Sequence, residues 1–528
     1  MSLTTVDLLI VALYASSLLA IAIWVSREPK GETKDTEDYF LAGRALPWWA
    51  IGASLIASNI SAEQIIGQSG QGFAVGIAIA AYEWQAAIVL IVVAKWFLPI
   101  FLKRGIYTMP QFLDQRYGSG VKSLMSVYWI VLYTAVNLTT VLWLGGLAMN
   151  SLTAWPVMVC MAALGCFAAL YSLYGGLKAV ALTDIIQVVI LIVGGAAITW
   201  IALDLIGDAD GAIGGLARIY EELPGHFKMI LAQDHPAYGD LPGIWTLLGG
   251  LWVLHFSYWG FNQYIIQRAL GARSLPEAQK GLAFAAFLKL LIPLIVVIPG
   301  IAAVILADQS LVDGAALAEK SDRTYGELMK IAPSGLRGLI FAALIAAVVS
   351  SLASMMNSIS TIFTMDIYRS IATGRTERHY VSVGRISAFA AMGAALLLAK
   401  PFIGGFESGF QTVQEYSGFI APGVVAVFLL GFFAKRTNAA GAFAALFASI
   451  GVNVALKFGA PDVPFIIRIW LVFMTCLAAA IVVSRITPNP APDRPVDLAD
   501  IGFGTRATFN VLAVVVTAIL VGLYVFLW

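Results

Sequence analysis

The chain has 528 residues, of which 60% are hydrophobic and only 12% are charged, and its mean hydropathy is +0.85. A soluble domain usually has about 25% charged residues, so the composition excludes an ordinary soluble enzyme or binding module and predicts a polytopic membrane protein. The net charge of +1 gives no indication of a nucleic-acid or acidic partner. Three cysteines lie in apolar runs and predict buried hydrophobic side chains, not disulfides or a metal cluster: Cys160, Cys166 and Cys476.

Fourteen segments are long and apolar enough to cross a bilayer, which takes about 20 helical residues. They are 6–25, 46–70, 76–101, 121–150, 155–175, 179–205, 241–268, 279–306, 335–370, 380–400, 405–433, 436–457, 463–486 and 507–528. The first has no basic residue before its apolar run, so we do not expect a signal peptide. The longest connections, 206–240 and 307–334, are too poor in apolar residues to fold alone. We therefore predict a single all-α membrane domain over 1–528.

The basic residues between these segments predict the orientation. If the N-terminus is outside, 21 Lys and Arg residues fall in cytoplasmic segments and nine in external ones. Loops rich in Lys and Arg are retained in the cytoplasm. We predict a multi-pass protein of the cell (inner) membrane, surrounded by lipid, with both termini outside.

The second segment contains polar residues that lipid cannot hydrogen-bond. It reads ASLIASNISAEQIIGQSGQG from Ala53 to Gly72. The segment 241–268 is interrupted in a similar way by Gly260 and Asn262. Free backbone at membrane depth is tolerated where it lines a cavity, and interrupted helices in both halves of a chain are typical of transporters with repeated halves. We predict that the first break forms half of a solute and ion site; a loosely packed helix with a Gly-rich end is the alternative.

Ionisable residues inside apolar segments are costly and usually face a cavity or a partner. Glu83 and Lys289 each need a partner from another helix or from a polar ligand, and a buried structural ion pair is the alternative for both. Polar residues also recur on one helical face of 335–370 and of 121–150, which predicts either contacts between helices or a wet path. These are Ser350, Ser354, Asn357, Thr361 and Thr364 in the former, and Tyr133, Asn137 and Thr140 in the latter.

Eight motifs, in order over nearly the whole chain, resemble the sodium/solute symporter family, and within it the bacterial sodium/galactose symporters of the sodium/glucose branch. They are DYFLAGR (38–44), ASLIASNISAEQ (53–64), AYEWQAA (81–87), YGGLKAVALTDIIQ (174–187), YWGFNQYIIQR (258–268), AAFLKL (285–290), VVSSLASMMNS (348–358) and FQTVQEYSGFIAPG (410–423).

The resemblance implies the leucine-transporter fold. In that fold two inverted repeats of five helices each contain a discontinuous helix, and extra helices lie at both ends, which agrees with fourteen transmembrane helices. The implied limits are 6–25 for the N-terminal extra helix, 46–205 and 241–433 for the two repeats, and 436–528 for the C-terminal extra helices.

The resemblance also implies a Na⁺ site made of neutral oxygens. The matching residues are Ala57, Ile60 and Ala347, through backbone carbonyls, and Ser350 and Ser351, through hydroxyls. Such oxygens replace the hydration shell of a hard cation and still let it leave. Asp184 matches a family aspartate on the sodium exit path that does not itself bind the ion.

The family's sugar site matches this chain at most positions. The hydrogen-bonding positions correspond to Gln64, Glu83, Asn137, Lys289 and Gln414, the aromatic that stacks on the sugar and closes the inner gate to Tyr258, and an outer-gate aromatic to Phe410. Amides both donate and accept, as sugar hydroxyls do. Three positions depart from the galactose pattern and leave the identity of the sugar open: Ala86 replaces Ser, His255 replaces Asn, and Gln68 replaces Met at the outer gate. A packing histidine is the alternative for His255.

These expectations predict a Na⁺-coupled symporter that imports a galactose- or glucose-like monosaccharide by alternating access. We expect no enzymatic activity, no organic cofactor and no nucleic-acid partner; homo-oligomerisation stays open. One alternative is symport of a sialate, organic acid or amino acid, whose charge Lys289 would attract and Glu83 would oppose. A membrane sugar sensor or enzyme is disfavoured because no catalytic domain follows the last segment and no nucleophile–His–acid set is present. The broken helices and aromatic gates disfavour a channel.

Overall fold

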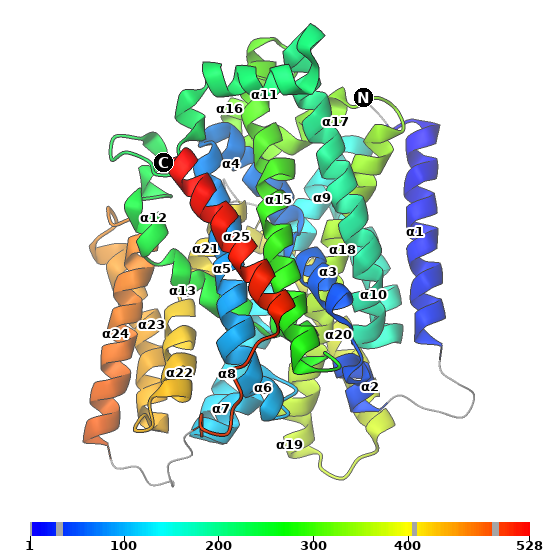
Figure 1. Ribbon diagram of the computed structural model, residues 1–528. Helices are drawn as coiled ribbons and strands as arrows, with labels where there is room; N and C mark the ends of the chain where they lie inside the picture. The colour runs from blue at the N-terminus through cyan, green and yellow to red at the C-terminus, as the bar shows by residue number, and fades with distance from the viewer. Residues whose placement is uncertain (1–2, 28–34, 404–408, 488–495) are drawn as a thin grey trace.

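The computed structural model describes residues 3–27, 35–403, 409–487 and 496–528. In these residues the regular elements are helices, gathered into an elongated bundle (Figure 1). Those of the first half are α1 (Thr5–Ser26), α2 (Thr36–Leu41), α3 (Trp48–Asn59), α4 (Gln68–Ala74), α5 (Ala81–Val92), α6 (Leu98–Lys103), α7 (Met109–Tyr117), α8 (Ser119–Val131), α9 (Thr139–Thr153), α10 (Val157–Gly207) and α11 (Gly211–Glu222).

The second half continues the bundle. Its helices are α12 (Ile244–Leu248), α13 (Leu251–His255), α14 (Gln263–Leu270), α15 (Leu275–Asp308), α16 (Gly314–Glu319), α17 (Thr324–Ile331), α18 (Leu336–Ile362), α19 (Arg369–Ile371), α20 (Glu377–Ile403), α21 (Gly409–Gly418), α22 (Ala421–Phe433), α23 (Ala439–Gly459), α24 (Phe465–Ile486) and α25 (Ala507–Phe526).

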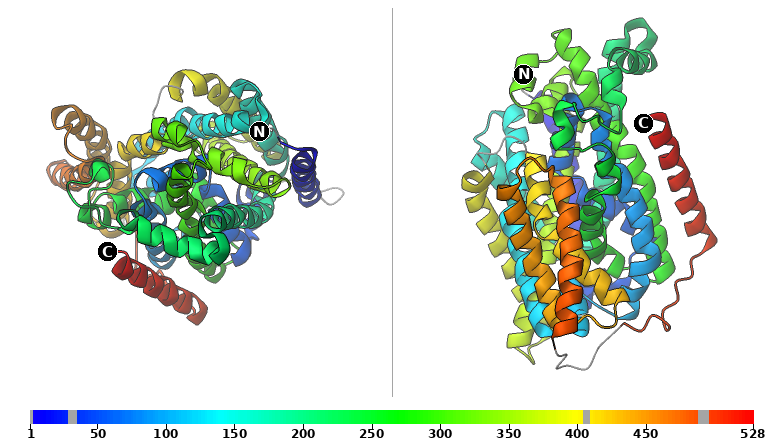
Figure 2. Two further views of the ribbon diagram at one scale, coloured as in Figure 1. Left: turned by 90° about the horizontal axis from the view of Figure 1, so that it is seen from above. Right: turned by 90° about the vertical axis from the view of Figure 1, so that its left-hand side faces the viewer.

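Ten helical runs among the described residues are long and apolar enough to cross a membrane, and two shorter apolar helices, Val157–Leu170 and Ala421–Phe433, accompany them. Burial separates inner from outer runs. In the most apolar part of Leu336–Ile371, 89% of the residues are buried, against 17% in Thr5–Val25 and in Ala507–Phe526. Figure 2 shows α1 and α25 at the outside of the bundle, so their apolar side chains are left for lipid.

The two predicted breaks are confirmed, and they explain why 46–70 and 241–268 are not among the ten continuous runs. Helix α3 ends at Asn59, Ile60 is extended, and a π-helical turn over Glu63–Gly67 leads into α4. In the second half a π-helical turn over Phe256–Gly260 is followed by an extended Asn262, whose side chain caps α14.

The boundary predicted between 155–175 and 179–205 falls at a single residue. Helix α10 runs from Val157 to Gly207 but is bent at Gly176, which has φ 64° and ψ −157°. A side chain there would also meet the Tyr39 carbonyl oxygen at 2.4 Å, so both the backbone angle and the close approach require glycine.

The predicted segment 405–433 is less continuous than expected. Its first residues, 405–408, lie outside the described residues, and the remainder is divided into α21 and α22. Pro422 is at the second position of α22, where its missing N–H costs no hydrogen bond, and it cannot continue a helix that comes before it.

The two broken helices are joined to each other away from their breaks. Leu46, just before α3, donates its amide to the Gly271 carbonyl at 3.0 Å and accepts from the Arg273 amide at 3.2 Å. Gly271 directly follows α14, so the approach to α3 and the end of α14 share a backbone bridge between Leu46 and Ala272.

Both chain ends lie at the same end of the bundle, together with α11, α16 and α17 (Figure 1). An even number of crossings has this consequence, in agreement with the fourteen predicted segments. Which side of the membrane this end faces stays a prediction.

Candidate functional site

One cavity between the two broken helices brings together side chains from distant parts of the chain. Every solute-binding and gate residue expected from the sequence lines it: Gln64, Gln68, Glu83, Asn137, His255, Tyr258, Lys289, Phe410 and Gln414. Ala86, the third departure, is fully buried but does not line it. The cavity thus gathers residues whose individual roles stay predictions.

Irregular helix turns place several of these residues. Gln64 lies in the π-helical turn Glu63–Gly67, Asn137 in a third such turn over Leu132–Leu138, and Tyr258 in the turn Phe256–Gly260. A π-helical turn inserts a residue and redirects the side chains around it, and such turns are frequent at functional sites.

Glu83 and Lys289 are partners of each other, although they are 206 positions apart. The Lys289 ammonium donates to the Glu83 carboxylate and to the Asn59 amide oxygen, and it lies 4.8 Å from the centre of the Trp259 ring. The Lys289 and Glu83 side chains are 1% and 3% exposed. The sequence left open whether this is a structural pair or a ligand site; it is a buried ion pair that lines the cavity.

The second Glu83 oxygen is also bonded. The Gln68 amide donates from Nε2 to Glu83 Oε1 at 2.7 Å. The outer-gate residue that departs from the galactose pattern is therefore attached to a predicted solute-binding carboxylate.

The predicted inner gate, Tyr258, is held by one amide group and one hydroxyl group. Asn59 Nδ2 donates to the Tyr258 hydroxyl at 3.1 Å, and the Tyr264 hydroxyl donates to the same oxygen at 2.5 Å. Asn59 thereby connects Tyr258 with Lys289. At the predicted outer gate the Phe410 ring lies 5.2 Å from that of Tyr82, edge to face.

Gln64 stabilises the break after α3 and also lines the cavity. Its Oε1 accepts from the Ser61 amide at 3.1 Å and from the Ser61 hydroxyl at 2.7 Å, so it satisfies a backbone group that the interrupted helix leaves free. On the other side, Tyr133 accepts from the Gln263 amide at 3.0 Å and donates to Asn262 Oδ1 at 2.6 Å. One residue of the polar face on 121–150 thus stabilises the second break.

Several buried polar atoms of the cavity have no hydrogen-bond partner among the described residues. They are Glu63 Oε2, Gln68 Oε1, Tyr82 OH, Asn137 Oδ1 and His255 Nε2. Buried polar atoms are almost always paired, so unpaired ones in a cavity indicate a ligand or water. Sequence reasoning quoted Glu63 within the first break but did not assign it to the site, because the family pattern points to its neighbour Gln64.

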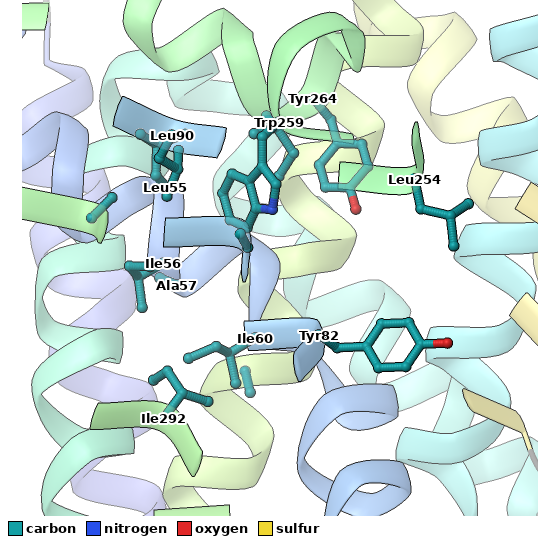
Figure 3. Packing of buried hydrophobic residues seen from close by; sticks show 14 of the residues in the cluster. Leu55, Ile56, Ala57, Ile60, Tyr82, Leu90, Leu254, Trp259, Tyr264 and Ile292 are labelled. Carbon is teal, nitrogen blue, oxygen red and sulfur yellow. The ribbon is translucent and has the colours of Figure 1, made fainter. Parts of the chain in front are cut away.

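The predicted sodium residues lie in α3, directly after it and in α18, and these two helices pack against each other. All five are fully buried: Ala57, Ile60, Ala347, Ser350 and Ser351. Ser351 donates to the Ser58 carbonyl at 3.0 Å, which ties the two helices together. Carbonyls in the last turn of a helix lack intrahelical partners, so the end of α3 offers free oxygens. Figure 3 shows Ala57 and Ile60 near this end.

Asp184 lies next to these residues. Its carboxylate accepts from Ser350 and Ser54 at 2.5 Å each and from Ser58 at 3.3 Å. The Ser54 oxygen also accepts from Arg268 Nε at 3.1 Å. Because Ser350 gives its proton to Asp184, its lone pairs stay available to a cation. Asp184 therefore contacts a predicted ion ligand, as a residue beside the ion would; its place on an exit path stays a prediction.

Comparison with known proteins identifies the family. The model of the sodium:solute symporter family matches residues 39–449. The chain belongs to this family. It is 47% identical to a sodium/glucose cotransporter of Vibrio parahaemolyticus, over 100% of this chain and 99% of the relative. It is 33% identical to the sodium/myo-inositol cotransporter 2 of Mus musculus, over 84% of this chain and 69% of the relative.

Solved structures place the chain in the leucine-transporter fold. A Na⁺-coupled sialic acid symporter in a substrate-bound, outward-open state superposes with a TM-score of 0.82 at 21% identity, over 93% of this chain and 99% of that one. A nucleobase-cation-symport-1 family transporter in a closed conformation superposes with a TM-score of 0.56 at 16% identity, over 87% of this chain and 98% of that one. The leucine-transporter fold expected from the family resemblance is confirmed, while the number of fourteen transmembrane helices and the limits of the repeats stay predictions.

Proposed function

We propose that the chain is a symporter that imports a neutral monosaccharide together with Na⁺ by alternating access. The observation that carries this proposal is the convergence of all the expected solute-binding positions on one buried cavity. The names of the relatives support it, since they are cotransporters of glucose and of myo-inositol with sodium. Both are neutral solutes with several hydroxyls.

The ion pair in the cavity favours a neutral solute over the alternative of an organic anion. An anion needs a cation to replace its lost hydration. Lys289 is the one Lys or Arg among the described residues that line the cavity, and Glu83 and Asn59 already accept from it. An entering carboxylate would have to displace Glu83 from Lys289 and leave the Glu83 carboxylate buried without a cation, with Gln68 as its remaining partner.

Coupling to one Na⁺ supplies the driving force. A charge that crosses 100 mV contributes about 2.3 kcal/mol, and a tenfold Na⁺ gradient adds roughly 1.4 kcal/mol. One coupled ion can therefore concentrate a neutral sugar by up to about 500-fold. We assign the ion to the α3–α18 contact, with Ala57, Ile60, Ala347, Ser350 and Ser351 as ligands.

Two further parts of the proposal concern architecture. We assign the inverted repeats to 46–205 and 241–433, because each range contains one of the broken helices. We place the protein in the cell (inner) membrane with both termini outside, because this orientation puts most of the Lys and Arg residues in cytoplasmic segments.

Uptake into proteoliposomes tests the proposal. Labelled galactose, glucose, mannose and a carboxylate sugar are offered under an inward Na⁺ gradient and, as the control, an inward K⁺ gradient. We expect a hexose to accumulate above its outside concentration with Na⁺ only. Accumulation of the carboxylate sugar alone would transfer the assignment to an anion symporter, and no uptake by folded protein would contradict symport of these sugars.

A further inference from the structure

We infer that Glu63, which the family resemblance does not assign to the sugar, contacts the solute, accepts hydrogen bonds from its hydroxyls and excludes anionic sugars by charge. This inference rests on the proposed function and assigns the rejection of charged sugars at that site to a residue outside the Glu83–Lys289 ion pair. Four observations support it, and the first is position. Glu63 is 7% exposed and lines the same cavity as Tyr258 and Lys289.

The second observation is that half of the Glu63 carboxylate is unused. Its Oε1 accepts from Gln64 Nε2 at 3.3 Å, while Oε2 is buried and has no hydrogen-bond partner among the described residues. The neighbouring Gln64 oxygen is occupied by Ser61. Of the two adjacent side chains, Glu63 is therefore the one with an oxygen free for a ligand.

The third observation is the charge balance of the cavity. Two carboxylates line it, those of Glu63 and Glu83, against one ammonium, that of Lys289. Lys289 pairs with Glu83, and no ion pair with Glu63 occurs among the described residues. Because charges in a cavity of low dielectric constant interact strongly, an ionised Glu63 that no cation compensates opposes a second anion.

The fourth observation is the kind of atom left unpaired elsewhere. Of the five unpaired cavity atoms named above, Gln68 Oε1 and Asn137 Oδ1 accept only, like Glu63 Oε2, while the Tyr82 hydroxyl and His255 Nε2 can take either role. Since each sugar hydroxyl can donate, a polyhydroxyl solute can satisfy all three acceptors, whereas a carboxylate group in place of a hydroxyl-bearing group adds only further acceptors. Polar sites reject ligands that leave their groups unpaired.

A matched pair of competing sugar derivatives isolates the effect of the solute's charge on binding. Glucuronate and its uncharged amide, glucuronamide, share one shape, and each is titrated against labelled hexose bound to the full-length protein in Na⁺. In the wild type we expect half displacement of the labelled hexose to require a glucuronate concentration at least tenfold higher than the glucuronamide concentration. In Glu63→Gln we expect this ratio to fall at least fivefold, and in Glu63→Asp, which keeps the charge, to stay near the wild-type value.

Asp366→Asn is the control for removal of a buried charge elsewhere. Asp366 is 3% exposed, accepts from Thr108 at 2.9 Å and does not line the cavity. We expect it to leave the ratio unchanged, whereas a purely structural effect of Glu63→Gln would weaken both competitors equally. Should Glu63→Gln fail to fold, Glu63→Thr replaces it, and the wild-type ratio is a test by itself.

The outcomes separate the two proposals. Hexose binding with a wild-type ratio near one, or a ratio that Glu63→Gln does not change, would overturn the role of Glu63 and leave sugar symport standing. A wild-type protein that binds no hexose in Na⁺ would overturn sugar symport, and the role of Glu63 with it.

Discussion

Gln68 and Glu83 share a hydrogen bond of 2.7 Å between the amide nitrogen of the first and a carboxylate oxygen of the second. The bond extends a chain of contacts through Lys289 and Asn59 to the hydroxyl of Tyr258. The residue at the predicted outer gate is thus connected with the residue at the predicted inner gate by side chains alone.

We expect Gln68→Glu to place a second carboxylate beside Glu83, with one ammonium for both. Repulsion at about 4 Å costs on the order of 4 kcal/mol at an effective dielectric constant of 20, so Na⁺-driven hexose uptake falls at least tenfold at neutral pH. Acidification supplies a proton that the pair can share, so uptake relative to wild type recovers as the pH is lowered. Gln68→Met is the uncharged control. If the ratio of variant uptake to wild-type uptake did not change with pH, repulsion between the two carboxylates would not be the cause of the loss.

Breaking the buried ion pair destabilises the protein as well as the site. Glu83→Gln leaves the Lys289 ammonium buried without its carboxylate, and we expect a loss of about 3–5 kcal/mol in stability. The double variant Glu83→Gln/Lys289→Met removes both charges and regains most of that loss, while hexose uptake stays abolished. Thermal unfolding and uptake, measured on the same preparations, distinguish the two effects. Normal hexose uptake by Glu83→Gln would remove Glu83 from the site.

Ser351→Ala removes a hydroxyl that is a proposed ion ligand and that also bonds the Ser58 carbonyl at 3.0 Å. We expect the Na⁺ concentration for half-maximal uptake to rise about tenfold, since a bond to a charged group contributes roughly 1.5–3 kcal/mol. The matched control is Ser360→Ala, on the same helix, whose hydroxyl is buried and has no partner among the described residues. Equal Na⁺ activation in both variants would exclude Ser351 from the ion site.

Close packing between α4 and α15 gives a prediction about stability. A side chain at Gly300 would meet the Ser69 carbonyl oxygen at 2.1 Å, and one at Gly72 would meet the Val297 carbonyl oxygen at 2.5 Å. We expect Gly300→Ala to lower stability by about 1–3 kcal/mol, because backbone atoms cannot give way easily. Gly393→Ala, where nothing lies within 4 Å, is the control and should cost nothing. Thermal unfolding in detergent measures both.

Features that depend on residues close together in the chain were predictable from sequence patterns. The two breaks were predictable because polar and glycine residues interrupt apolar runs, and Gly176 separates two spans where the pattern places their boundary. The cavity residues were predictable through motifs, since the family resemblance carries information on contacts between helices that periodicity lacks.

Contacts between distant helices were not predictable from patterns in the chain. Nothing in the sequence shows that Lys289 reaches Glu83, because the pairing depends on how α15 packs against α5. The free oxygen of Glu63 was missed for a similar reason. Both Glu63 and Gln64 line the cavity, but the Gln64 oxygen is bonded to Ser61, and only the path of the backbone through the break decides which of the two keeps a free oxygen.

The backbone bridge between Leu46 and Ala272 makes α3 and α14 a single mechanical unit. The bond from Asn59 to Tyr258 joins the two broken segments again, whereas the proposed ion ligands lie on both sides of the seam between α3 and α18. A cation bound by the proposed ligands would therefore hold this unit against α18 for as long as it stays bound. When it leaves, we expect the seam to slide open while the paired segments keep their mutual geometry, so the departure of sodium, and not a rearrangement inside the pair, sets the moment at which the solute is released.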